Sequence, residues 1–371
     1  MSFSYRQNIN FLKCFAGIRA PLYVQYALSN ACNMHCRMCN VVQARQREKE
    51  LTITEIEQLA DTLKQMGVGL IILTGGEPLL REDIAKVVRT FHDRKFSVRI
   101  QSNGMLFSKD LLEELKSSGL GGITISLHSL SAEKMAYITN QPDALEKLSE
   151  AICLLNEVFS SPEYILGINT VVCGLNIDEI PAIVKFATRV GFSISLIPVH
   201  LDRGDQFIVR GKDLTFDISK NDYPAIDRLY DELISLKRGG YNIYNSEHFL
   251  KESPAFLKSG KVSWKCESPD LYFSISPSGI FLPCVDLEGS YSMLDPGFLQ
   301  LWKTAAFKNE IRDRVAKCSG CMYACYPEFS YMLHSKSHFI RRAFEYRKMR
   351  GSKPRQLTPG TIHDLIQEDA T

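Results

Sequence analysis

The feature that most constrains the fold is an alternation of two kinds of segment, repeated six times between residues 22 and 237. Each unit has a short apolar run rich in β-branched residues, typical of a buried strand, and then a longer segment with helical spacing of its apolar residues. This alternation predicts parallel strands joined by right-handed crossovers, and therefore an α/β fold. Six units can form a partial barrel or a doubly wound sheet.

The expected elements follow one another in strict order. The strands are 22–28, 69–73, 97–101, 122–126, 164–172 and 193–198, and the helices are 54–66, 82–94, 109–117, 143–159, 177–190 and 221–237. Thr52 or Thr54 can cap the first helix, and glycines at 67, 119 and 191 follow helix ends. In such a scaffold the reactive face lies at the carboxyl ends of the strands.

Composition narrows the class of protein. The chain has 371 residues, of which 45% are hydrophobic, so one large domain and a smaller one are expected. A formal charge of +2 gives no global attraction to nucleic acid. Neither a signal peptide nor a membrane-spanning run is recognisable, which predicts a cytoplasmic protein. In that compartment the 11 cysteines are expected to be reduced, and clustered ones are expected to bind metal.

Three of these cysteines follow the first predicted strand directly. Cys32, Cys36 and Cys39 form a C-x-x-x-C-x-x-C pattern within "CNMHCRMCN". Structural zinc takes four protein ligands, usually from paired C-x-x-C units, whereas this loop supplies three thiolates. Three thiolates on a cubic four-iron cluster leave one iron with an open coordination position, which can bind a substrate.

The loop and its place in the chain resemble the radical S-adenosylmethionine superfamily. The resemblance implies a partial (β/α)6 TIM-like barrel and a four-iron four-sulfur (4Fe-4S) cluster whose open iron chelates S-adenosylmethionine. It further implies reductive cleavage of that cofactor to a 5'-deoxyadenosyl radical, which abstracts a hydrogen atom from the substrate. Met38 is a departure, since an aromatic residue usually precedes the third cysteine.

Further motifs match the family's cofactor-binding positions. "TGGEP" follows the second strand, so Gly75, Gly76 and Glu77 are expected at the methionine ammonium of the cofactor. The remaining expected cofactor contacts lie at the ends of the next strands: Asn103 in "QSNG", Ser126 and Asn169. His128 occupies a position where an acidic residue is common.

A second group of cysteines lies beyond the six units, at 266, 284, 318, 321 and 325. Their arrangement around a predicted hairpin and a Trp-containing helix resembles the SPASM extension and its shorter twitch form. The twitch pattern nominates Cys266, Cys284, Cys318 and Cys321 for a probable second 4Fe-4S cluster, and it leaves Cys325 as a candidate to replace one of them. The alternative is a structural zinc ribbon.

The predicted organisation has four parts. They are an N-terminal extension (1–20), the barrel (21–238), a smaller α+β twitch/SPASM-like domain (239–333) and a basic tail (334–371). A surface helix is favoured for the tail over a membrane-binding role.

The sequence favours an oxidoreductase that acts on a non-peptide metabolite, an alcohol, sugar-like or lipid-linked, because only 31 residues precede Cys32. Flavodoxin or ferredoxin is the expected electron donor. The alternatives are a peptide maturase with a separate leader-binding partner, and a non-catalytic iron–sulfur or zinc protein. No catalytic base is nominated, although His200, Asp202 and Arg203 follow the sixth strand.

Overall fold

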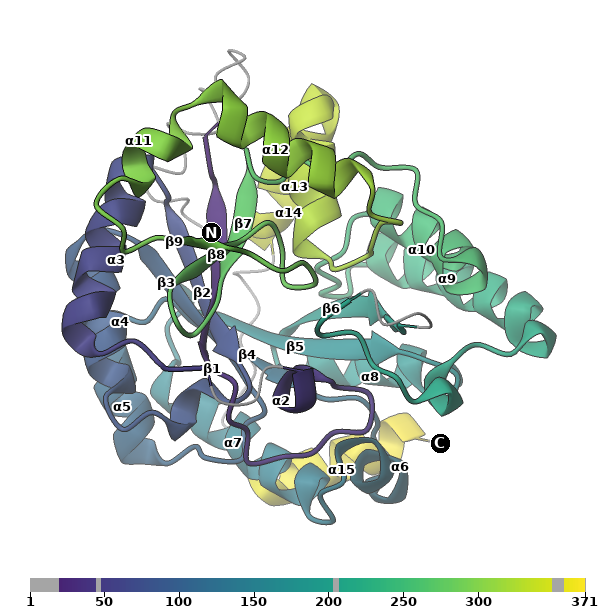
Figure 1. Cartoon of the computed structure of the whole chain (residues 1–371). Helices are drawn as coiled ribbons and strands as arrows, with labels where there is room; N and C mark the ends of the chain where they lie inside the picture. Colours follow the sequence, from purple (N-terminus) through teal and green to yellow (C-terminus); the bar gives the residue numbers. More distant parts are fainter. Residues whose placement is uncertain (1–19, 45–47, 203–206, 349–356, 371) are drawn as a thin grey trace.

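A single mixed sheet organises the described part of the chain. In the computed structural model, the described residues are 20–44, 48–202, 207–348 and 357–370. Within them nine strands join in the order β6-β5-β4-β3-β2-β1-β7-β8-β9 (Figure 1). The first six strands pair in parallel and in sequence order, as a partial barrel requires.

The strands of the barrel have the predicted places. They are β1 (Tyr23–Ser29), β2 (Leu70–Gly75), β3 (Ser97–Ser102), β4 (Gly122–Ser126), β5 (Ile165–Val172) and β6 (Ser193–Pro198). Side chains alternate between the two faces of each strand; on β3, Val98 and Ile100 are buried toward the helices while Arg99 and Gln101 occupy the inner face. The expected α/β partial barrel is therefore confirmed.

Helices cover the outer face of this sheet. They are α3 (Ile53–Met66), α4 (Ile84–Asp93), α5 (Lys109–Ser117), α6 (Ala132–Thr139), α7 (Ala144–Val158), α8 (Ile180–Arg189) and α9 (Tyr223–Arg238). The short α2 (Val41–Ala44) follows the cysteine loop instead, and Val41 lines the cavities inside the barrel. A capping box begins α3, because the Thr52 hydroxyl accepts the Glu55 amide while the Glu55 carboxylate accepts the Thr52 amide at 2.8 Å. Gly67 ends that helix at a φ of 86°.

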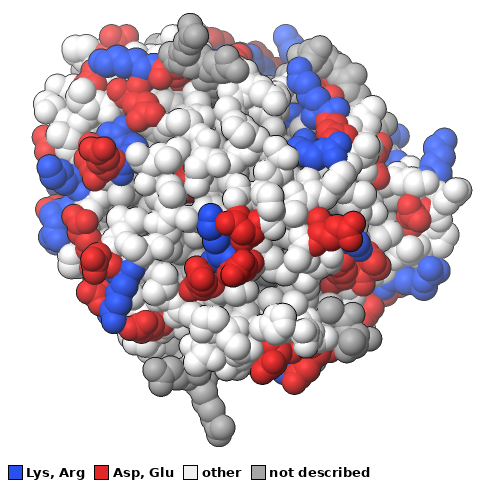
Figure 2. Space-filling view, turned by 90° about the horizontal axis from the view of Figure 1, so that it is seen from below, with Lys and Arg blue, Asp and Glu red and all other residues white. Residues whose placement is uncertain are grey.

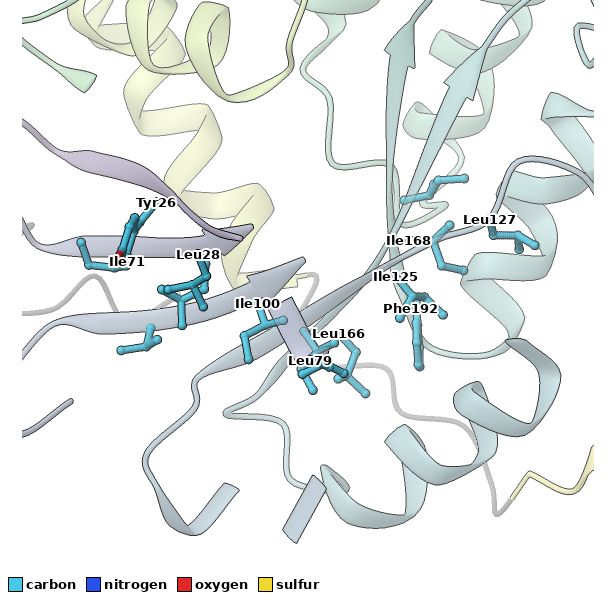
Figure 3. Close-up of a cluster of buried hydrophobic side chains, with 14 of the residues drawn as sticks. Tyr26, Leu28, Ile71, Leu79, Ile100, Ile125, Leu127, Leu166, Ile168 and Phe192 are labelled. Atoms are coloured by element: carbon cyan, nitrogen blue, oxygen red, sulfur yellow. The ribbon is translucent and has the colours of Figure 1, made fainter. Parts of the chain in front are cut away.

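The core lies between the sheet and these helices. Figure 3 shows apolar side chains from neighbouring strands, among them Leu28, Ile71, Ile100 and Ile168, gathered along the sheet. All four are fully buried, and each such side chain stabilises the fold by about 1.5–3 kcal/mol. This packing holds the strand ends in fixed positions, which is what a site at those ends needs.

The C-terminal segment continues the same sheet. It comprises α10 (Glu247–Ser259), β7 (Tyr272–Ile275), β8 (Ile280–Leu282), β9 (Tyr291–Ser292), α11 (Phe298–Trp302), α12 (Ala305–Ala316), α13 (Cys325–His334), α14 (Lys336–Lys348) and α15 (Pro359–Ala370). β7 pairs in parallel with β1, and β8 returns antiparallel to β7. The predicted hairpin therefore exists, and it extends the barrel sheet beyond β1.

Part of the predicted basic tail is inside the protein. Arg342 on α14 is fully buried, and its Nε lies 3.4 Å from the Glu328 carboxylate. Ile340 and Phe344 on the same helix are 54% and 63% exposed. The helix thus packs on the protein's own surface, anchored by Arg342.

The charged surface carries both signs together. Figure 2 shows Lys and Arg side chains interspersed with Asp and Glu on one face, with broad areas that bear neither. Among the described residues, no helix combines the length and apolar character needed to cross a membrane.

Candidate functional site

The three cysteines after β1 line one cavity. Cys32, Cys36 and Cys39 all border a space of about 320 Å³ at the carboxyl ends of the strands. The Cys39 amide donates to the Cys36 carbonyl at 3.0 Å, so the loop turns between these two cysteines. The Cys32 sulfur lies 3.4 Å from the Met34 amide and 3.8 Å from the Asn103 side-chain amide. Such N–H groups stabilise a thiolate.

The arrangement fits a four-iron cluster better than one ion. No three His, Cys, Asp or Glu side chains among the described residues are grouped closely enough for a single metal ion. A cubic cluster needs its thiolates spread around a cavity, because each thiolate binds a different iron. Burial raises the pKa of Cys36 to about 12, so metal binding must displace its proton.

Gly75 and Gly76 bring β2 against the cysteine loop. Gly76 donates to the Ser29 carbonyl at 2.7 Å, and the next residue donates to the Ala31 carbonyl at 2.8 Å. A Cβ on Gly76 would lie 2.0 Å from the Ala31 oxygen, and one on Gly75 would lie 2.1 Å from the Ser29 oxygen. Only glycine allows this approach, which fixes the loop immediately before Cys32.

The Glu77 carboxylate lies buried between the ends of β2 and β3. It is fully buried and accepts hydrogen bonds from the Leu79 amide (3.1 Å), the Ser102 hydroxyl (2.9 Å) and the Asn103 amide (2.7 Å). Burial raises its pKa, with these hydrogen bonds acting in the opposite direction. Glu77 does not border the cavity of the cysteine loop among the described residues. Its carboxylate links the ends of β2 and β3 through these hydrogen bonds, and Gly75 and Gly76 line the cavity of the cysteine loop.

The other expected cofactor positions do line this cavity. Asn103, Ser126 and Asn169 border it from the ends of β3, β4 and β5. Met38 and His128 border it as well, and the His128 Nδ1 accepts the Val171 amide at 3.3 Å. Burial lowers the pKa of His128 to about 4, so this ring is neutral at pH 7.

Four of the five later cysteines line a second cavity. Cys266, Cys284, Cys318 and Cys321 border a space of about 410 Å³. The Gly320 amide lies 3.4 Å from the Cys318 sulfur, and the Tyr272 hydroxyl lies 3.5 Å from the Cys266 sulfur. Four thiolates around one cavity, with polar hydrogens on the sulfurs, fit a fully ligated cluster.

Cys325 lies apart from that set. It is the first residue of α13 and borders a third cavity, of about 230 Å³, inside the barrel. The structure therefore places Cys325 apart from the other four cysteines. Spacing in the sequence could not decide which four of the five belong together. Of the remaining cysteines, Cys173 is buried and Cys153 half-buried, and Cys14 is outside the described residues.

A buried ion pair lies between the two cysteine sites. Arg210 borders both cavities, and its Nε lies 2.8 Å from an Asp286 carboxylate oxygen. Its Nη2 also donates to the Gly320 carbonyl at 2.8 Å. The Tyr323 hydroxyl donates to the other Asp286 oxygen at 3.2 Å. Sequence reasoning missed this group, because only the fold brings residues of three distant segments together.

His200 has a structural position rather than that of a free base. Its Nε2 accepts the Met322 amide at 2.8 Å, and its ring stacks on Tyr323 at 3.9 Å between centroids. Burial lowers its pKa well below the usual value, and the charge of Arg210 adds to this effect. Asp202 accepts the Phe207 amide at 3.1 Å, and Arg203 is outside the described residues.

Comparison with known proteins divides the chain into two matched regions. The model of the "Radical SAM superfamily" matches residues 26–187, and a "Domain of unknown function (DUF3463)" matches residues 219–344. The chain is 36% identical over 166 residues to the GTP 3',8-cyclase of Chlorobaculum tepidum, covering 44% of this chain and 49% of the relative. It thus spans about half the length of that relative. It is 24% identical to the AdoMet-dependent heme synthase of Methanosarcina barkeri, over 82% of this chain and 89% of the relative.

Solved structures share the fold. Streptococcus suis SuiB bound to S-adenosylmethionine superposes with a TM-score of 0.61 and 19% identity, covering 79% of this chain and 68% of SuiB. The anSMEcpe structure with bound AdoMet gives a TM-score of 0.59 and 17% identity, over 89% and 98% of the two chains.

Proposed function

Because the model of the radical SAM superfamily matches residues 26–187, we propose that the chain is an enzyme of this superfamily that carries out radical chemistry on a non-peptide metabolite. The superfamily uses a 4Fe-4S cluster and S-adenosylmethionine, which together supply a 5'-deoxyadenosyl radical on reductive cleavage of the sulfonium. The single observation that carries the proposal is the shared cavity of Cys32, Cys36 and Cys39 with the glycine backbone of β2.

The chain's own residues have distinct tasks in this proposal. The three cysteines hold the cluster, and the Cys32 sulfur receives two N–H donors that favour its thiolate form. The backbone at Gly75 and Gly76 offers polar groups to the cofactor's methionine end. Asn103, Ser126 and Asn169 offer amide and hydroxyl groups to the remainder of the cofactor.

The second site supports an oxidation. We assign Cys266, Cys284, Cys318 and Cys321 as its ligands, since these four share one cavity. A fully ligated cluster has no open iron for a substrate and supplies a place for an electron removed from one. The proposed reaction is therefore a two-electron oxidation, or a related modification, of an alcohol or sugar-like compound.

The barrel cavity that Cys325 borders is the proposed substrate site. It shares Thr74, Gln101 and Asn169 with the cavity of the cysteine loop, so the two spaces adjoin. The names of the two sequence relatives, a heme synthase and a GTP cyclase, refer to non-peptide compounds. This agrees with a metabolite as substrate. The peptide-bound structure of SuiB is related to this chain at 18% identity and shares the fold with it.

Anaerobic reconstitution tests the proposal. Two four-iron clusters predict about eight irons per chain, together with reductant-dependent release of 5'-deoxyadenosine from S-adenosylmethionine. Cys36→Ala is expected to lose this release and about four irons, whereas the matched control Cys153→Ala, outside both cysteine sets, is expected to keep both. Cofactor cleavage by Cys36→Ala at the unmodified rate would refute the assignment.

A further inference from the structure

Cys325 faces the barrel interior instead of the second cysteine site. The cavity it borders is lined by inward-facing residues of the strands, including Gln25 on β1, Thr74 on β2 and Ser195 on β6. Cys325 is half-buried as a residue, and it borders this cavity. The cysteine is thus placed where a molecule inside the barrel would touch it.

The lining of this cavity carries no ionisable charge among its described residues. Its polar groups are amides and hydroxyls, and the rest of the lining is apolar. The amides include Gln25, Gln101 and Asn169, and the hydroxyls include Tyr23 and Ser195. The charge of Arg99 acts on Cys325, but Arg99 is not among the residues that border the cavity. Moving a charged group into such a space costs several kcal/mol of lost hydration, and no charged side chain of the lining is there to pair with it.

A buried hydroxyl beside Cys325 points to a ligand. The Tyr23 side chain lines the cavity and is 0% exposed. Among the described residues, the only partner of its hydroxyl is the Cys325 thiol, and that contact does not meet the geometry of an ordinary hydrogen bond. Sulfur is a weak hydrogen-bonding partner, so a ligand with a polar oxygen would give this buried hydroxyl a stronger one.

We propose that Cys325 is a thiol of the substrate cavity and not a cluster ligand. With the Tyr23 hydroxyl, it contacts a part of the substrate that is uncharged and hydrogen-bonding, such as a hydroxyl or carbonyl group. The proposal rests on the proposed function only in calling the ligand the substrate. The position of Cys325 and the neutral lining stand independently of any reaction.

Thiol reagents of different charge test this on the anaerobically reconstituted full chain. Methyl methanethiosulfonate is uncharged, whereas its sulfonatoethyl and trimethylammonioethyl analogues carry one negative and one positive charge. Each reagent transfers its alkylthio group to a thiolate, forms a mixed disulfide and releases methanesulfinate. Tandem mass spectrometry locates the label among Cys318, Cys321 and Cys325, and rates are scaled by those measured with free cysteine.

The uncharged reagent is expected to label Cys325 at least about tenfold faster than either charged reagent, because only the charged ones must lose hydration. Equal scaled rates, a charged reagent reacting fastest, or no labelling of Cys325 would each overturn the proposal. Iron content gives a second measurement. Cys325→Ser is expected to retain about eight irons, while Cys284→Ser falls to about four. A fall to four in Cys325→Ser would make that residue a ligand.

The two proposals fail in different ways. Selective labelling of Cys325 without any release of 5'-deoxyadenosine would reject the radical reaction and leave the neutral cavity established. Release of 5'-deoxyadenosine with unselective labelling would reject the cavity proposal alone.

Discussion

Arg210→Met is expected to destabilise the folded protein by about 3–5 kcal/mol, because it leaves the Asp286 carboxylate buried without its cation. Arg210 is 5% exposed and Asp286 is 2% exposed, with 2.8 Å between Nε and the carboxylate oxygen. Two unit charges about 4 Å apart attract by about 4 kcal/mol at an effective dielectric constant near 20. The hydrogen bonds from Tyr323 and from the Val209 backbone are polar contacts that the Asp286 carboxylate keeps in the variant.

The assay is equilibrium urea unfolding, performed anaerobically on preparations with equal iron content. The double variant Arg210→Met/Asp286→Leu is expected to recover most of the loss, because it removes both charges. The deficit of Arg210→Met is also expected to shrink as the pH falls, because loss of Arg210 raises the pKa of folded Asp286, so the folded variant takes up this proton at a higher pH than the natural protein does. Burial already raises the pKa of Asp286, and without Arg210 nothing comparable opposes this. A loss below about 1 kcal/mol, or a double variant less stable than Arg210→Met, would refute the reasoning.

Three further outcomes follow from the structure. Gly76→Ala is expected to lose about four irons and cofactor cleavage, because the new Cβ would lie 2.0 Å from the Ala31 oxygen. The control Gly297→Ala, whose new Cβ would have no atom within 4 Å, is expected to keep both. His128 has a pKa of about 4 in the folded protein, so on acidification the unfolded chain takes up the proton first. Lowering the pH from 7 to 5 is therefore expected to reduce the free energy of unfolding by about 2 kcal/mol. His128→Asn is expected to abolish this part of the pH dependence, measured by urea unfolding. Thr52→Ala removes the capping box of α3 and is expected to cost about 1 kcal/mol in the same assay, with Thr52→Ser close to the natural protein; equal stability of all three would contradict the role of the cap.

Local patterns predicted the barrel well. The bounds of β4, β6 and α5 coincide with the predicted 122–126, 193–198 and 109–117, because glycine and capping residues mark the ends of these elements. The sequence did not predict α10, which holds Pro254 in its interior, where proline ordinarily ends a helix. Packing against α9 and β6 stabilises this helix in the folded chain.

Part of the candidate site could be predicted from the sequence, and the rest depends on contacts between distant segments. The motifs that follow the strands predicted residues of the first cavity, because each motif lies at the end of its own strand. Spacing could not separate Cys325 from Cys321, because four residues of chain allow either cavity to be reached. The hydrogen bonds that the Glu77 carboxylate accepts from Ser102 and Asn103 could not be predicted either, because the proximity of these residues depends on the pairing of neighbouring strands.

The parallel pairing of β7 with β1 has a mechanical consequence. Cys32 follows one end of β1, and Cys284 follows β8, whose position is fixed through β7 by the pair Tyr23 and Tyr272. Strand register therefore sets the position of Cys284 relative to Cys32. A single residue inserted within β7 would shift Cys284 by about 3.3 Å and reverse the faces of the side chains that follow.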